Sequence, residues 1–153
     1  MNLSFVFPPF TIETIFPKRE MSLHAESDAV LMGWEQRRRN RQRVRSVKGR
    51  GLALELPTGT VLQDGDLLYA EQDLCIAVKA KMEDLLVTPL NDAGRVAILA
   101  YELGNRNLPV SIRHGFLATP YNRLVEALLE KMGVPYEWER GKFEPMSAHH
   151  HHG

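Results

Sequence analysis

Apolar residues between about Val30 and Lys81 alternate with polar or small ones, at the spacing of two that is typical of β-strands. Two segments show this best, residues 51–57 and residues 74–80. Their shared faces would be formed by Leu52, Leu54 and Leu56 in the first segment, and by Leu74, Ile76, Val78 and Ala80 in the second. Turn signals around Gly49, at 57–59 and at 63–66 separate the strands. The pattern predicts a small all-β domain whose strands each bury one side.

After Met82 the apolar spacing becomes helical. Asn91 is predicted to cap a first helix, and Gly104 stands where a left-handed residue is expected to end it. Its buried stripe would be Val96, Leu99 and Leu103.

A second helix is predicted over residues 121–132, with Gly133 as its stop. Its inward-facing residues would be Leu124, Leu128 and Met132.

Strand-like segments surround these two helices. They are residues 85–90, 108–112 and 115–119, the last two joined by a turn at His114 and Gly115, and then 134–139. The order β-α-β-β-α-β is that of a ferredoxin-like domain. We therefore predict an α+β protein with a small all-β N-terminal domain followed by a ferredoxin-like C-terminal domain.

The chain is expected to have four parts. Residues 1–20 would be an extended arm, or an overlong start with translation from Met21. Residues 21–82 would form the β-rich, partner-binding domain, residues 83–145 the dimerisation and metal-binding domain, and residues 146–153 a flexible histidine tail. No basic segment precedes the first apolar stretch and no apolar run approaches the roughly 20 residues of a membrane span, so neither a signal peptide nor a membrane association is expected.

Composition narrows the function further. The 19 basic and 19 acidic residues cancel, so the net charge predicts no general attraction to nucleic acid or membranes. Cys75 is the one cysteine, which excludes an internal disulfide and a multi-cysteine zinc site and suits a reducing cytosol. Its apolar neighbours predict a buried, inert thiol.

Local charge is concentrated in residues 37–50, the basic strip, which has no acidic residue. Its members are Arg37, Arg38, Arg39, Arg41, Arg43, Arg45, Lys48 and Arg50. The strip could contact phosphates, face an acidic protein partner, or form a solvated strand whose charge prevents edge aggregation. The absence of an accompanying aromatic platform favours the last two interpretations.

No phosphate-binding loop, nucleophile elbow or zinc-protease motif is present, and His24 and His114 are isolated, so no catalytic role is expected. The richest chemistry lies in the histidine run His149, His150, His151 and His152. Imidazole suits nickel, copper and zinc, and such a run is either a native labile metal site or part of a purification tag.

Four segments resemble the family of the urease accessory protein UreE, a nickel metallochaperone. They are "LPTGTVLQDGDLL" at 56–68, "AYELGNRNLPVSI" at 100–112, "LVEALLEKMGV" at 124–134 and "KFEP" at 142–145, the last similar to the Phe-Glu-Pro before that family's histidine-rich tail. The resemblance implies a cytoplasmic, non-enzymatic homodimer that holds nickel between its subunits. It also implies delivery to a urease-assembly GTPase and the apo-urease complex.

Two positions depart from that family's pattern. Asn107 stands where the family has a dimer-axis histidine, and residues 120–123 replace a His-x-His pair. A neutral amide oxygen is a poorer nickel ligand than imidazole. The expected ligands for Ni²⁺, and for Zn²⁺ or Cu²⁺ in vitro, are therefore His149–His152, with His114 as a remote auxiliary. The position of the histidine run shortly after Phe-Glu-Pro favours a native tail over a purification tag.

The sequence thus predicts a nickel chaperone whose basic strip, chiefly Arg37, Arg38, Arg39, Arg41 and Arg43, faces an acidic partner. The alternative is a dimeric scaffold of urease assembly that does not deliver metal itself. Nucleic-acid binding through the strip is a third and weaker possibility.

Overall fold

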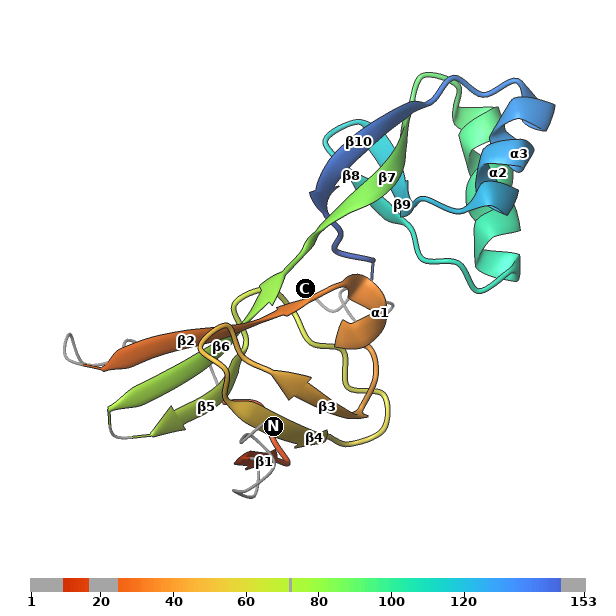
Figure 1. Ribbon diagram of the computed structural model, residues 1–153. Coiled ribbons are helices and arrows are strands. Elements are labelled where there is room, and N and C mark those ends of the chain that lie inside the picture. The colour runs from red at the N-terminus through yellow and green to blue at the C-terminus, as the bar shows by residue number, and fades with distance from the viewer. Residues whose placement is uncertain (1–9, 17–24, 72, 147–153) are drawn as a thin grey trace. The chain divides into compact units, whose positions relative to one another are not determined.

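The computed structural model describes residues 10–16, 25–71 and 73–146 of the chain (Figure 1). The histidine run, His24 and most of the predicted N-terminal arm lie outside the described residues. The chain divides into two compact units, Met1–Lys81 and Met82–Gly153, called here the N-terminal and the C-terminal unit.

The N-terminal unit consists of two three-stranded sheets and one helical turn. Its elements are β1 (Phe10–Ile12), β2 (Glu26–Met32), α1 (Trp34–Arg37), β3 (Arg41–Arg45), β4 (Gly51–Glu55), β5 (Leu67–Glu71) and β6 (Leu74–Ala80). One sheet has the order β1-β4-β3 and the other β2-β6-β5. In each sheet the central strand has one parallel and one antiparallel neighbour.

The two sheets share one core, and the predicted alternation is confirmed there. Leu52, Leu54 and Leu56 are buried, as are Ile76, Val78 and Ala80. The predicted turns are also confirmed by three glycines with left-handed φ angles, namely 90° at Gly49, 87° at Gly59 and 89° at Gly65. Alternating side chains on twisted strands thus account for most of this core.

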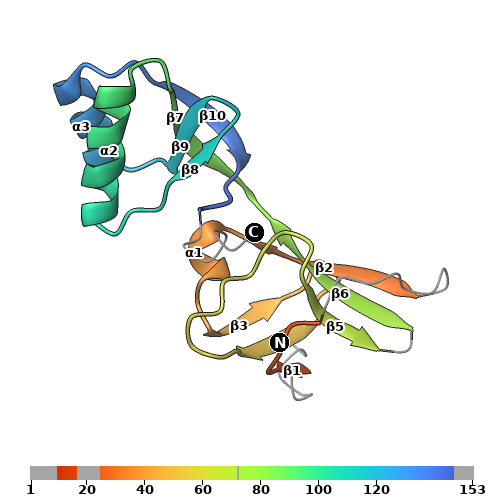
Figure 2. The ribbon, with the colours of Figure 1, turned by 180° about the vertical axis from the view of Figure 1, so that it is seen from behind.

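The C-terminal unit has the β-α-β-β-α-β order that the sequence predicts. Its elements are β7 (Met82–Pro89), α2 (Ala93–Asn105), β8 (Ser111–Arg113), β9 (Phe116–Pro120), α3 (Arg123–Met132) and β10 (Glu137–Lys142). All neighbours in the sheet β10-β7-β9-β8 are antiparallel. Both helices lie on one face of this sheet, as the two opposite views show (Figures 1 and 2). The predicted α+β class with a ferredoxin-like C-terminal domain is confirmed.

The predicted buried stripe of α2 is correct, but both of its predicted ends are wrong. The first cap is Asp92, whose side chain accepts a hydrogen bond from the Arg95 amide, rather than Asn91. Gly104 is still helical, and the residue with the left-handed conformation is Asn107, with φ 56°. Glycine inside a helix costs only about 1 kcal/mol, so it need not end one.

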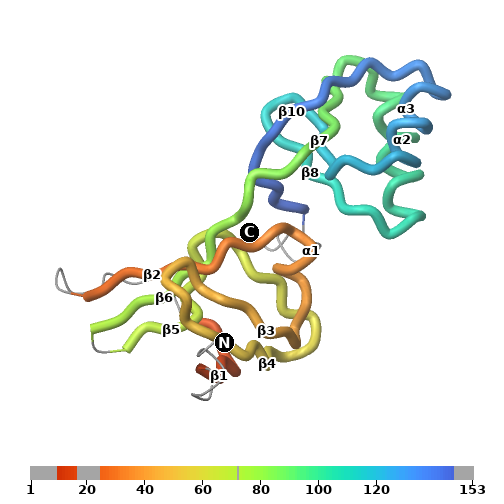
Figure 3. Tube along the Cα trace, viewed as in Figure 1, coloured from red at the N-terminus to blue at the C-terminus, as the bar shows by residue number. Residues whose placement is uncertain are grey.

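The predicted face of α3 needs a correction of one position. Val125 and Leu129 are its buried residues, whereas Leu124 is 74% exposed. Leu128 and Met132 are half-buried at the margin of the core. Gly133 ends the helix with φ 67°, as predicted, and Asn122 caps its start. The tube view follows both helices and their connections to the sheet (Figure 3).

Candidate functional site

Asn107 closes helix α2 and is exposed at its C-terminal end. The Asn107 amide donates to the Gly104 carbonyl at 2.9 Å, and the Leu108 amide donates to the Leu103 carbonyl at 2.9 Å. These two bonds, with a left-handed residue between them, form a Schellman motif. Asparagine tolerates this conformation better than most residues, which gives Asn107 a structural role whatever it binds.

His114 occupies the hairpin turn between β8 and β9 and is exposed. Its φ of 52° and the φ of 82° at Gly115 fit the tight turn predicted there. The Gly115 carbonyl accepts a hydrogen bond of 2.9 Å from the Leu90 amide, so this turn lies near the N-terminal end of α2.

Asn107 and His114 therefore lie at opposite ends of α2. A helix of 13 residues is about 20 Å long, whereas nitrogen ligands lie about 2 Å from a bound metal ion. One chain cannot place both side chains on one ion. Within the described ranges, no three histidine, cysteine, aspartate or glutamate side chains are gathered in a group that could hold a metal.

The residues after β10 return to the other edge of the sheet. Phe143 is 1% exposed, Glu144 forms an ion pair of 2.8 Å with Arg113, and the Met146 amide donates to the Val110 carbonyl at 2.8 Å. The segment thus lies beside residues 110–113. The described chain ends beside Val110, close in sequence to Asn107.

The basic strip is less uniform than its sequence suggests. Arg37 is 2% exposed, so it cannot contact a partner directly as predicted; helix α1 carries it into the unit, where its carbonyl accepts a hydrogen bond from Leu62. Lys48 and Arg50 form ion pairs with Glu26 and Asp28. The exposed remainder consists of Arg38, Arg39, Arg41, Arg43 and Arg45.

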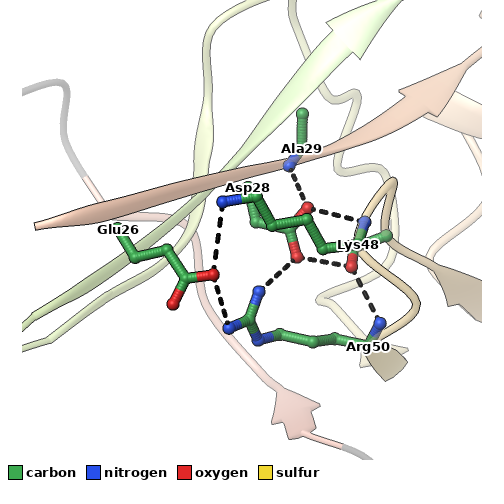
Figure 4. Close-up of polar contacts among 6 residues, drawn as sticks. Glu26, Asp28, Ala29, Lys48 and Arg50 are labelled. Atoms are coloured by element: carbon green, nitrogen blue, oxygen red, sulfur yellow. Dashed lines mark hydrogen bonds and ion pairs between the residues drawn. The ribbon is translucent and has the colours of Figure 1, made fainter.

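Asp28 joins strand β2 to the turn between β3 and β4 (Figure 4). Its fully buried carboxylate accepts hydrogen bonds from the Ser46 hydroxyl at 2.5 Å and Arg50 Nη1 at 2.8 Å. The Ala29 and Lys48 amides also donate to it, at 2.8 and 3.1 Å. Burial raises the pKa of Asp28, but these donors outweigh burial and the net shift is downward from 3.8. The charge therefore remains, and it fixes the hairpin that carries β3.

One aromatic contact in the strip was not anticipated. The Arg38 guanidinium lies 4.5 Å from the centroid of the Trp34 ring, a cation–π arrangement. The spacing of four residues between Trp34 and Arg38 could have predicted this contact, since residues at i and i+4 share a helix face.

Two remaining expectations concern Cys75 and membranes. Cys75 is half-buried in β6 rather than fully buried as predicted. Among the helices formed by the described residues, none is long and apolar enough to cross a membrane.

Comparison with known proteins agrees with this two-unit architecture. Residues 12–81 match the model of the UreE urease accessory protein N-terminal domain, and residues 83–153 match that of its C-terminal domain. The chain belongs to the UreE family. UreE proteins are urease accessory chaperones and not enzymes, so both the resemblance and the expected lack of catalysis are confirmed.

Individual UreE relatives are similar to this chain over most of its length. The urease accessory protein UreE of Geobacillus kaustophilus (strain HTA426) is 32% identical over 140 residues, which cover 90% of this chain and 95% of that protein. The UreE proteins of Burkholderia pseudomallei (strain 1710b) and Burkholderia mallei (strain SAVP1) are each 32% identical over 136 residues. Those matches cover 86% of this chain and 67% of either relative, so the chain spans about two thirds of their length.

Proposed function

We propose that this chain is a cytoplasmic nickel metallochaperone that binds Ni²⁺ through His149–His152 and passes it to the urease maturation machinery. The recipients would be the urease-assembly GTPase and the apo-urease complex. Membership of the UreE family supports the role in urease assembly. The position of Met146 beside Val110 is the observation that carries the proposed site.

The distance along the chain fits a site at the Asn107 end of α2. Only residues 147 and 148 separate Met146 from His149, and three extended steps span at most about 10 Å. Asn107 is three residues from Val110 along the chain, so the first histidines are within reach of the region around Asn107. His114 keeps the auxiliary role that the sequence suggests for it.

The chemistry of the run suits transport better than permanent binding. Neutral imidazoles bind Ni²⁺, and they bind Zn²⁺ and Cu²⁺ as well. Protons compete with the metal for the same nitrogens, so the affinity should fall as the pH drops through about 6.5. A competing site with better-matched ligands would then remove the ion readily.

A homodimer would bring two such tails together. Ile98 and Tyr101 are 57% and 69% exposed on the side of α2 away from its buried stripe. A two-fold contact uses the same patch on both subunits, which makes an apolar helix face suitable for it. Pairing through α2 would join two Asn107 residues and two histidine tails in one dimer.

The basic strip would supply the docking surface of the N-terminal unit. With Arg37 buried, docking falls to the other arginines predicted to face the partner, Arg38, Arg39, Arg41 and Arg43, all of which are exposed. An acidic protein partner would be attracted to them, and added salt would weaken the complex.

Complementation of a urease-producing host that lacks its own UreE would test this function. At limiting nickel, the full chain should restore urease activity, whereas a chain ending at Ala148 should restore little. At saturating nickel the two should differ much less. Equal restoration by both chains at limiting nickel would instead favour the scaffold that assembles urease without delivering metal.

A further inference from the structure

Strand β3 forms an edge of the sheet β1-β4-β3. Among the described residues, β4 is its one hydrogen-bonded strand neighbour. Two backbone bonds lie just beyond its ends, from the Leu56 amide to the Asn40 carbonyl and from the Ser46 amide to the Arg50 carbonyl, both 2.8 Å. These bonds fix which residues of β3 point toward β4.

Hydrogen-bonded pairs alternate along an antiparallel ladder. With Asn40 and Ser46 bonded toward β4, Gln42 and Val44 are bonded that way too. The main-chain amides and carbonyls of Arg41 and Arg43 therefore point to the open edge. Within the part of the chain that the structure describes, no hydrogen bond uses them.

The side chains of Arg41 and Arg43 are exposed on one face of the same strand. Arg43 lies opposite Ala53, and Arg41 lies opposite Glu55. No ion pair within the described ranges involves either arginine. The alternate residues Gln42 and Val44 are half-buried on the other face. The edge thus offers free backbone groups together with two accessible positive charges.

The edge is also held rigid before any partner binds. The Asp28 carboxylate bonds the turn after β3, and the Val47 amide donates to the Ala29 carbonyl at 2.7 Å. At the other end, Gln42 Nε2 donates to the Gln36 carbonyl at 2.6 Å. A strand ordered in advance loses little conformational entropy when another strand joins it.

We propose that β3 binds an extended acidic segment of a partner protein as an added strand. Glutamate or aspartate at alternate positions would face Arg41 and Arg43, and small apolar residues between them would lie on the Val44 side. The arginines would repel a second copy of β3, so the same charges oppose self-association and select an acidic strand. The inference rests on the docking role proposed for the basic strip, but not on nickel binding.

The test uses the full chain with EDTA present, so that metal has no part in the result. The probe is a fluorescein-labelled ten-residue peptide that alternates glutamate with valine and threonine, followed by fluorescence anisotropy. A second peptide has the same composition but groups the glutamates at one end. The alternating peptide should bind roughly three- to tenfold more tightly than the grouped one, because only it places each carboxylate opposite an arginine.

Two variants separate the backbone from the charge. Arg43→Pro removes one outward amide while leaving the ladder to β4 intact, and should weaken binding about fivefold or more. Arg41→Gln with Arg43→Gln keeps the edge and should weaken binding roughly three- to tenfold. Arg123→Gln with Lys131→Gln removes the same charge from exposed positions on α3 and should change nothing. Circular dichroism at 25 °C establishes that each variant is folded.

If the two peptides bind equally tightly and Arg41→Gln with Arg43→Gln still weakens binding, strand addition is overturned and only the docking role remains. If neither peptide binds, strand addition is overturned. If Arg41→Gln with Arg43→Gln also leaves docking of the acidic partner unchanged, the docking role of the basic strip is overturned as well. Displacement of the peptide by single-stranded DNA at lower concentration than by unlabelled peptide would overturn the acidic partner in favour of nucleic acid.

Discussion

The main-chain amide of Met146 donates a 2.8 Å hydrogen bond to the carbonyl of Val110. This bond joins the end of the described chain to the segment that follows Asn107, at the C-terminal end of α2. The described chain therefore ends three residues before His149, the first histidine of the proposed metal site.

Phe143 should be the main anchor of that segment. Because its ring is 1% exposed, Phe143→Ala should lower the free energy of unfolding by about 3–4 kcal/mol. Glu144→Gln, which breaks only the exposed pair with Arg113, should cost less than about 1 kcal/mol. Urea unfolding measures both variants, and equal costs would mean that the ring does not anchor the segment.

The apolar face of α2 should control the oligomeric state. If the proposed dimer forms through α2, replacement of both Ile98 and Tyr101 by glutamate should convert it to monomer, since two buried charges per subunit oppose pairing. Leu124→Glu is the matched control, because Leu124 is also an exposed apolar helix residue, on α3. Sedimentation velocity distinguishes the outcomes. A dimer that survives the double change places the interface elsewhere.

Asp28 should be essential to the stability of the N-terminal unit. Asp28→Ala leaves the Ser46 hydroxyl and Arg50 Nη1 without this acceptor, and should lower the free energy of unfolding in urea by about 3 kcal/mol. Glu26→Ala, which removes an exposed partner of the same arginine, should shift the unfolding midpoint little. A similar midpoint for all three proteins would show that the buried network contributes no net stability.

The stability supplied by Asp28 should depend on pH in a defined direction. Its pKa is lower in the folded than in the unfolded chain, where it is near 3.8, so its contribution is present above that value. It is lost as the pH falls from about 3.8 through the folded pKa. The difference in thermal midpoint between the native chain and Asp28→Asn should thus be constant from pH 7 to 5 and shrink below pH 4. A difference that grows with acid would contradict this assignment.

Local sequence patterns predicted most of the fold because their causes are local. Alternation at Leu52 and Leu54 and the glycine at 65 depend on near neighbours, and the structure follows them. The predicted end of α2 at Gly104 is wrong because the point where a helix ends also depends on what packs after it. Gly104 tolerates the helix, and Asn107 ends it where Leu108 can pack against the core.

Long-range relationships were not accessible from sequence. The parallel pairing of β2 with β6 and the bonds from Asp28 to Ser46 and Arg50 join distant residues that no short pattern connects. The sequence predicts a basic strip that faces an acidic partner, but it does not indicate that α1 buries Arg37 or that Asp28 pairs with Arg50. Metal binding by the histidine run remains a prediction. The hydrogen bond from Met146 to Val110 shows only where the described chain ends.

Nickel titration calorimetry at pH 7 on the full chain and on a chain ending at Ala148 tests the central claim most directly. The two proteins share every described residue, so any difference belongs to the tail. We predict that the full chain binds Ni²⁺ and that truncation abolishes the binding, while His114→Asn leaves it nearly unchanged. Binding that survives truncation would contradict the proposed site, and absence of binding by the full chain would contradict the proposed nickel carrier.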